Sequence, residues 1–70
     1  MLDEVLFMEM RVFIEFLHRF SMKPKDANYI FEKHGIWNYI EDCYDVLHMN
    51  GDEYVLNDVV MILQKKGALL

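Results

Sequence analysis

The sequence lacks the cross-links that often stabilise a very small domain. Its 70 residues include a single cysteine, Cys43, so no disulfide can form within the chain. Hydrophobic residues make up 54% of the sequence, more than the roughly 45–50% usual for soluble domains. A chain this short buries only about three fifths of the surface that its unfolded form exposes. We therefore expect one domain, 1–70, with a dense core and with surplus apolar surface that another chain covers.

Basic residues are scarce as well. Seven Lys and Arg residues stand against 12 Asp and Glu residues, and the net charge is −5. A surface of this sign repels phosphate backbones and anionic lipid surfaces, so we predict neither a nucleic-acid partner nor a membrane partner. The expected partner is a protein, either a different chain or a second copy in a homo-oligomer.

The sequence also lacks a long uncharged apolar run. The apolar N-terminal segment contains Glu9, Arg11 and Glu15, which a membrane-spanning helix would not carry. The chain starts with Asp3 and Glu4 where a secretory signal would have positive charge. Together with the single cysteine, these features predict a cytoplasmic protein.

Proline and glycine are few, and they divide the chain into segments at Pro24, Gly35, Gly51 and Gly67. Each segment has the periodicity of an amphipathic helix. An alternative start of the last helix places Asn57 at its N-cap, with an extended stretch before it. The sequence therefore predicts an all-α fold, a compact bundle of about four short helices at about residues 2–20, 24–34, 36–48 and 54–66.

The first predicted helix is apolar on more than one side. Phe7, Met8 and Ile14 fall outside its main apolar arc, whereas Glu9 falls inside it. Because one bundle cannot cover all sides of one helix, we predict that Phe7, Met8, Glu9 and Ile14 form an interface. Glu9 is either buried and in need of a partner, or turned toward solvent. The main arc holds Leu2, Val5, Leu6, Met10, Val12, Phe13, Phe16, Leu17 and Phe20.

Polar side chains cluster on one edge of the third predicted helix. Glu41, Tyr44, Asp45 and His48 recur at helical spacing, and Asp45 and His48 are placed as an ion pair or two metal ligands would be. Zinc sites need more ligands than this at recognisable spacing. We predict a surface pair of a carboxylate and an imidazole, and no metal or other cofactor.

An enzyme that depends on a metal or a thiol, using His48, Asp45 and Cys43, is the alternative. Cys43 lies at the centre of the apolar face of the third helix, where a cysteine behaves as a small hydrophobic residue. We therefore predict that the chain is not an enzyme and has no catalytic residue. The leading hypothesis is a helical protein–protein interaction module.

The stretches Phe31–Gly35, Tyr44–His48, Gly51–Tyr54 and Asn57–Val59 carry a family resemblance. Over nearly its whole length the chain resembles a family of small uncharacterised bacterial proteins, of which the Tyr-Asp-x-Leu-His segment is most typical. It departs from them before Pro24, where the family often has serine. Members of that family look like companions of ADP-ribosyltransferase-like toxins encoded beside them. The resemblance thus implies an accessory or antitoxin-like role, and it brings no catalytic residue with it.

Overall fold

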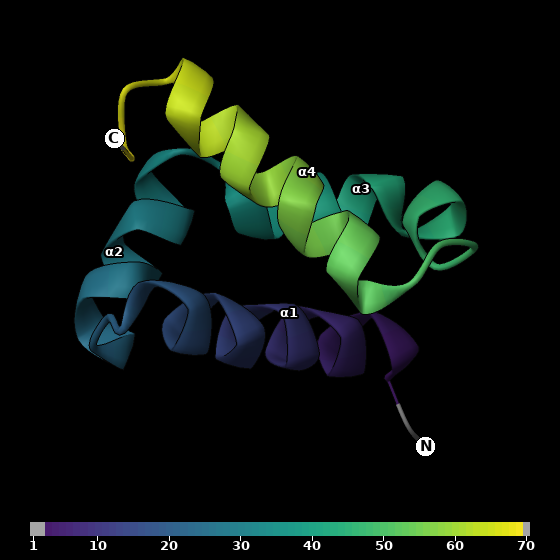
Figure 1. Cartoon of the computed structure of the whole chain (residues 1–70). Helices are drawn as coiled ribbons and strands as arrows, with labels where there is room; N and C mark the ends of the chain where they lie inside the picture. Colours follow the sequence, from purple (N-terminus) through teal and green to yellow (C-terminus); the bar gives the residue numbers. More distant parts are fainter. Residues whose placement is uncertain (1–2, 70) are drawn as a thin grey trace.

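Four helices follow one another in this computed structural model, which describes residues 3–69. Helix α1 spans Glu4–Phe20, α2 spans Pro24–Lys33, α3 spans Ile36–Leu47 and α4 spans Asp52–Lys65 (Figure 1). No strand occurs within residues 3–69, and the predicted all-α class is confirmed. None of the helices in that range combines the length and the apolar content needed to cross a membrane.

Local side chains fix the ends of the helices. The carboxylate of Asp3 accepts hydrogen bonds from the backbone N–H groups of Val5 and Leu6, at 3.0 and 3.1 Å, and so caps α1. Pro24 lies in the first turn of α2, where its missing N–H is not needed. Gly35 has φ +70° and separates α2 from α3 in the left-handed conformation that glycine adopts without strain.

The last helix begins earlier than predicted. Helix α4 starts at Asp52, directly after the extended Gly51, and Asp52 and Glu53 place negative charge in its first turn. The start lies two residues before the approximate position 54 given by the sequence, and the alternative with Asn57 as the N-cap is wrong. The predicted start of the first helix at Leu2 lies outside the described residues.

Helix α1 is the element against which the others pack. It contacts α2, α3 and α4, and α2 also contacts α3. In Figure 1, α4 crosses above α1 and α2 lies at one end of it. Buried apolar side chains from all four helices meet between these elements. The core consists of Met8, Val12, Phe16, Ala27, Phe31, Ile36, Ile40, Leu47, Val55, Leu56, Val59 and Leu63.

Aromatic contacts join α1, α2 and α3. Phe31 of α2 is fully buried, and its ring meets Phe13 and Phe16 of α1 edge-on, with centroids 5.3 and 5.0 Å apart. The ring of Trp37 on α3 lies 4.9 Å from that of Phe31. These separations are in the range that aromatic pairs favour. Phe31 therefore fixes the position of Trp37 beside α1.

The buried face of α1 is rotated from the predicted arc. Met8 is 3% exposed, whereas Leu6 and Met10, which the arc assigned to the core, are 52% and 49% exposed. The cause is α4, which packs on the side of α1 that carries Arg11. The Arg11 Nε donates to the Asp52 carboxylate of α4 at 2.8 Å. The prediction that Met8 belongs to an interface is therefore wrong.

A hydrogen bond joins α3 to α4. The Tyr39 hydroxyl donates to the Asp58 carboxylate at 3.1 Å. Burial, followed by the charge and the hydrogen bond of Asp58, raises the pKa of Tyr39 to about 12. Because the folded-state pKa lies above the ordinary value near 10, this group's stabilisation is complete below pH 10 and is lost as the pH rises toward 12.

Replacing Tyr39 with phenylalanine tests this contact. We expect Tyr39→Phe to lower the free energy of unfolding by about 1 kcal/mol at pH 7, because one hydrogen bond is lost. The loss of stability that wild type shows between pH 10 and 12 should become smaller. Urea unfolding followed by circular dichroism, at pH 7 and between pH 10 and 12, measures the free energy of unfolding of both proteins. The exposed Tyr29, changed to phenylalanine, is the control, and an unchanged alkaline slope in Tyr39→Phe would contradict the assignment.

Candidate interaction site

The apolar side chains that α1 leaves exposed form one stripe along the helix. We define the outer stripe as Leu6, Phe7, Met10 and Ile14, which are 52%, 43%, 49% and 47% exposed. Phe7, Met10 and Ile14 are spaced by three and four residues, so they share one side of the helix, and the partly buried Leu17 continues the series. Half exposure of four side chains of roughly 200 Å² each leaves about 400 Å² of apolar surface. The largest apolar patch on a typical monomer is about 300–600 Å² and often has a function.

The structure sorts the predicted interface residues into three environments. Phe7 and Ile14 lie in the outer stripe, Met8 lies in the core, and Glu9 is buried at 8% exposure. Leu6 and Met10 were missed because the helical wheel assigned them to the core. The spacing of three and four residues from Phe7 to Leu17 was the signal that could have added Met10 to the second apolar side of α1.

A groove lies beside the outer stripe, between α1 and the start of α3. Its volume is about 240 Å³. We call it the Trp37 groove, and its lining residues are Leu6, Glu9, Met10, Phe13 and Trp37. The Trp37 ring is held in place, because it packs on Phe13 with centroids 5.3 Å apart and its indole N–H donates to Asn28 at 3.1 Å. Sequence reasoning gave Trp37 no role at the interface.

Glu9, a residue that is only 8% exposed, places an acidic group in this groove. Burial raises the pKa of Glu9, and the negative charges of Glu41 and Asp3 raise it further. Among residues 3–69, no Lys, Arg or His side chain forms an ion pair with Glu9. Of the two sequence interpretations, the buried one is therefore correct, and the charged groups that raise the pKa of Glu9 have the same sign as its carboxylate.

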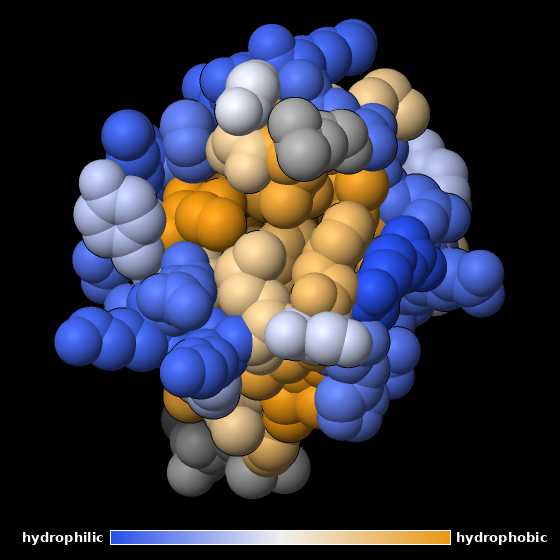
Figure 2. Space-filling view, turned by 60° about the vertical axis from the view of Figure 1, so that its left-hand side comes forward, coloured by the Kyte–Doolittle hydropathy of each residue, from blue (hydrophilic) through white to orange (hydrophobic). Residues whose placement is uncertain are grey.

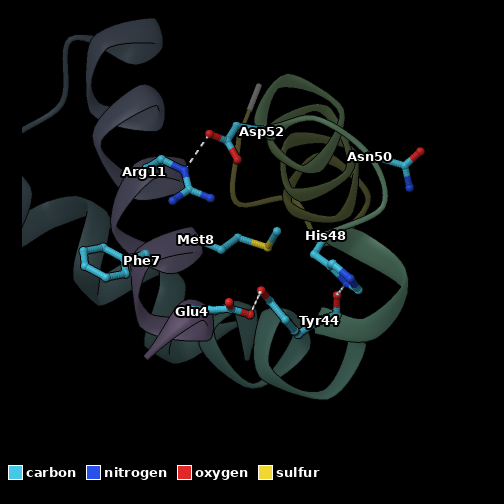
Figure 3. A pocket seen from close by; sticks show the side chains of 8 residues that line it. All are labelled: Glu4, Phe7, Met8, Arg11, Tyr44, His48, Asn50 and Asp52. Atoms are coloured by element: carbon cyan, nitrogen blue, oxygen red, sulfur yellow. Dashed lines mark hydrogen bonds and ion pairs between the residues drawn. The ribbon is translucent and has the colours of Figure 1, made fainter. Parts of the chain in front are cut away.

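A polar pocket of about 440 Å³ opens at the N-terminal end of α1 (Figure 3). The Tyr44 hydroxyl donates to Glu4 at 3.2 Å, and Arg11 pairs with Asp52. The Nδ1 atom of His48 lies 2.9 Å from the backbone oxygen of Tyr44, and the two rings stack with centroids 4.9 Å apart. These polar groups therefore engage one another and tie α1, α3 and α4 together. The lining consists of Glu4, Phe7, Met8, Arg11, Tyr44, His48, Asn50 and Asp52.

The predicted polar cluster on α3 does not come together as one site. Tyr44 and His48 line the polar pocket, whereas the Glu41 carboxyl group lies beside that of Glu9. Asp45 is exposed, and within the described part of the chain it forms no ion pair with His48. The predicted Asp45–His48 pair is wrong because the imidazole stacks on Tyr44 instead.

Cys43 is partly buried and packs against the core. It precedes His48 by five residues, which corresponds to about 140° around an α-helix, so the two side chains leave α3 on different sides. Among residues 3–69, no three His, Cys, Asp or Glu side chains are grouped so that they could hold a metal ion.

Apolar surface also extends over the side of the molecule on which α2 lies. Figure 2 shows a band of apolar side chains on that side, with hydrophilic side chains along both margins. Many apolar residues around the core are only partly buried. Among them are Leu17, Phe20, Met22, Ile30, Ala68 and Leu69.

A family model for a protein of unknown function, DUF3791, matches residues 10–66. The chain belongs to the DUF3791 family. The DUF3791 match spans α2, α3, α4 and most of α1, and it includes Met10, Ile14 and Trp37 of the features described above. It agrees with the resemblance to an uncharacterised family seen in the sequence. No curated protein and no solved structure matches this DUF3791 chain.

Proposed function

We propose that this DUF3791 protein is a non-catalytic interaction module that binds a protein through the outer stripe of α1. The observation that carries the proposal is the exposure of four large apolar side chains, each 43–52% accessible, along one side of one helix. At about 25 cal/mol per Å², covering about 400 Å² would contribute roughly 10 kcal/mol before the costs of association are subtracted.

The partner is another protein or a second copy of the chain. The net charge of −5 disfavours nucleic acids and anionic lipid surfaces. We further propose that the protein acts in the cytoplasm. The resemblance to companions of ADP-ribosyltransferase-like toxins supports an accessory or antitoxin-like role, in which the outer stripe would bind the toxin.

Replacing Ile14 with glutamate tests the proposal. Ile14→Glu should weaken association at least about tenfold, because a carboxylate in the middle of the stripe would lose its hydration on binding. Light scattering over a wide range of concentration measures self-association. Calorimetric titration with an ADP-ribosyltransferase-like toxin protein measures binding of a different chain.

Met61→Glu is the matched control. Met61 is 49% exposed, close to the 47% of Ile14, but it lies on α4 outside the outer stripe. Both variants should keep the helix content of wild type in circular dichroism, and only Ile14→Glu should lose binding. The proposal is wrong if wild type stays monomeric and the toxin protein either fails to bind or binds wild type and Ile14→Glu equally well.

A further inference from the structure

We infer that the Trp37 groove receives a lysine or arginine side chain of a partner protein, presented from an amphipathic helix that docks on the outer stripe of α1. The inference rests on the proposed function and adds the chemistry of the partner. Leu6 and Met10 belong both to the stripe and to the groove. A helix that covers the stripe therefore passes directly over the groove.

The size and the walls of the groove fit one long side chain. Its volume of about 240 Å³ is below the roughly 300–1,000 Å³ of pockets for drug-sized ligands. Leu6, Met10 and Phe13 offer apolar contacts for an aliphatic stem, and lysine and arginine cover apolar surface with such stems. The indole ring of Trp37 is the aromatic surface that attracts a cation most strongly.

The carboxylate of Glu9 decides the charge of the ligand. Glu9 is 8% exposed, lines the groove, and has the carboxyl group of Glu41 beside it. A nearly buried carboxylate without a cation is unfavourable, and a second carboxylate nearby adds repulsion. A cation entering between the apolar walls would therefore relieve both effects. Among residues 3–69 the chain itself supplies no such cation.

A second copy that docked through its own α1 would not meet these requirements. None of the outer stripe residues is basic. The two arginines of α1 are engaged on α4, since Arg11 pairs with Asp52 and Arg19 donates to Asn57, both at 2.8 Å. The expected partner is thus a different protein, whose docking helix has one basic residue flanked at a spacing of three or four by apolar residues.

Two small probes of equal chain length test the groove directly. We expect n-hexylammonium to bind roughly tenfold more tightly than 1-hexanol at pH 7, because only the ammonium group can pair with Glu9. Two-dimensional NMR measures the binding through the chemical shift of the indole N–H of Trp37. This signal is unambiguous because Trp37 is the only tryptophan in the sequence. In Glu9→Gln the two probes should bind about equally.

The dependence on pH gives a second readout on the unmodified chain. Hexylammonium binding should weaken as the pH falls through the pKa of Glu9, because the protonated group no longer attracts a cation. Glu41 of α3 and Asp3 at the start of α1 are the acidic groups that act on Glu9. Glu41→Gln should therefore weaken the binding less than Glu9→Gln does. Hexanol binding should not weaken over the same range.

The inference is wrong if wild type binds hexanol as tightly as hexylammonium, or if Glu9→Gln leaves the preference unchanged. Either result can occur while Ile14→Glu still loses its protein partner, in which case the proposed function stands alone. The chain could also self-associate through the outer stripe, and this association could be unchanged in Glu9→Gln. That result would assign the outer stripe to a second copy and overturn the inference.

Discussion

Phe31→Ala should remove most of the stability of the protein. A buried phenylalanine changed to alanine costs about 3–5 kcal/mol, because both the transfer of the ring out of water and the packing around it are lost. Phe31 is fully buried and contacts Phe13, Phe16 and Trp37. A domain of 70 residues has a free energy of unfolding of only about 4–10 kcal/mol. The variant is therefore expected to lose a large part of its stability and to unfold at a much lower temperature and urea concentration than wild type.

Urea unfolding followed by circular dichroism and Trp37 fluorescence measures this effect. Trp37 should become more exposed to water in Phe31→Ala, because Phe31 holds its ring beside α1. Tyr29→Ala on the same helix is the control, since Tyr29 is 62% exposed and should change stability by only about 0.5 kcal/mol. A loss below about 1 kcal/mol in Phe31→Ala would contradict the role assigned to the ring.

Glu9→Gln is expected to stabilise the isolated chain at neutral pH. Burial, followed by the charges of Glu41 and Asp3, raises the pKa of Glu9 in the folded state. The folded state then holds this proton more tightly than the unfolded state, so Glu9 favours folding at low pH and opposes it once ionised. Removing the charge should therefore raise the free energy of unfolding at neutral pH, and with it Tm.

Thermal unfolding of both proteins between pH 3 and 8 checks the sign. The higher stability of Glu9→Gln relative to wild type should appear as the pH rises through the raised pKa of Glu9. It should disappear below the ordinary glutamate value of 4.5, where wild type is protonated in both states. Glu15→Gln is the control because it removes the same charge from the exposed side of α1. Equal gains in both variants at pH 7 would mean that net charge, and not burial, is responsible.

Stability and binding are thus expected to oppose each other at Glu9. A residue that lowers the stability of the free chain, and that would pair with a cation in a complex, is typical of functional sites. The pair of variants separates the two effects, since Glu9→Gln should make the chain more stable and less selective at the same time.

The number, order and approximate extent of the helices could be predicted from the sequence because their signals are local. Pro24 opens one helix, Gly35 supplies the left-handed residue between two others, and apolar periodicity defines the helical segments. The local signals were less decisive for the last helix, because two different first residues were compatible with the same sequence. Helix α4 begins at Asp52 because acidic residues suit its first turn, although the apolar pattern starts later.

The candidate site could be predicted only in part. Phe7 and Ile14 lie far enough from the main apolar arc that the helical wheel showed them. The contribution of Trp37 could not be found in this way, because it comes from a different helix and depends on the aromatic contacts of Phe31. The polar pocket likewise joins Tyr44 to Glu4, residues 40 positions apart.

By itself, the sequence determined that this acidic chain folds as four amphipathic helices and carries more apolar surface than one small core uses. Tertiary structure alone decided which side of α1 is covered. Met8 and Met10 are chemically the same residue, yet α4 buries the first, while the second stays exposed. The reason is that helical periodicity fixes only the angles between the side chains of one helix. The packing of the other helices decides which of those side chains face the core.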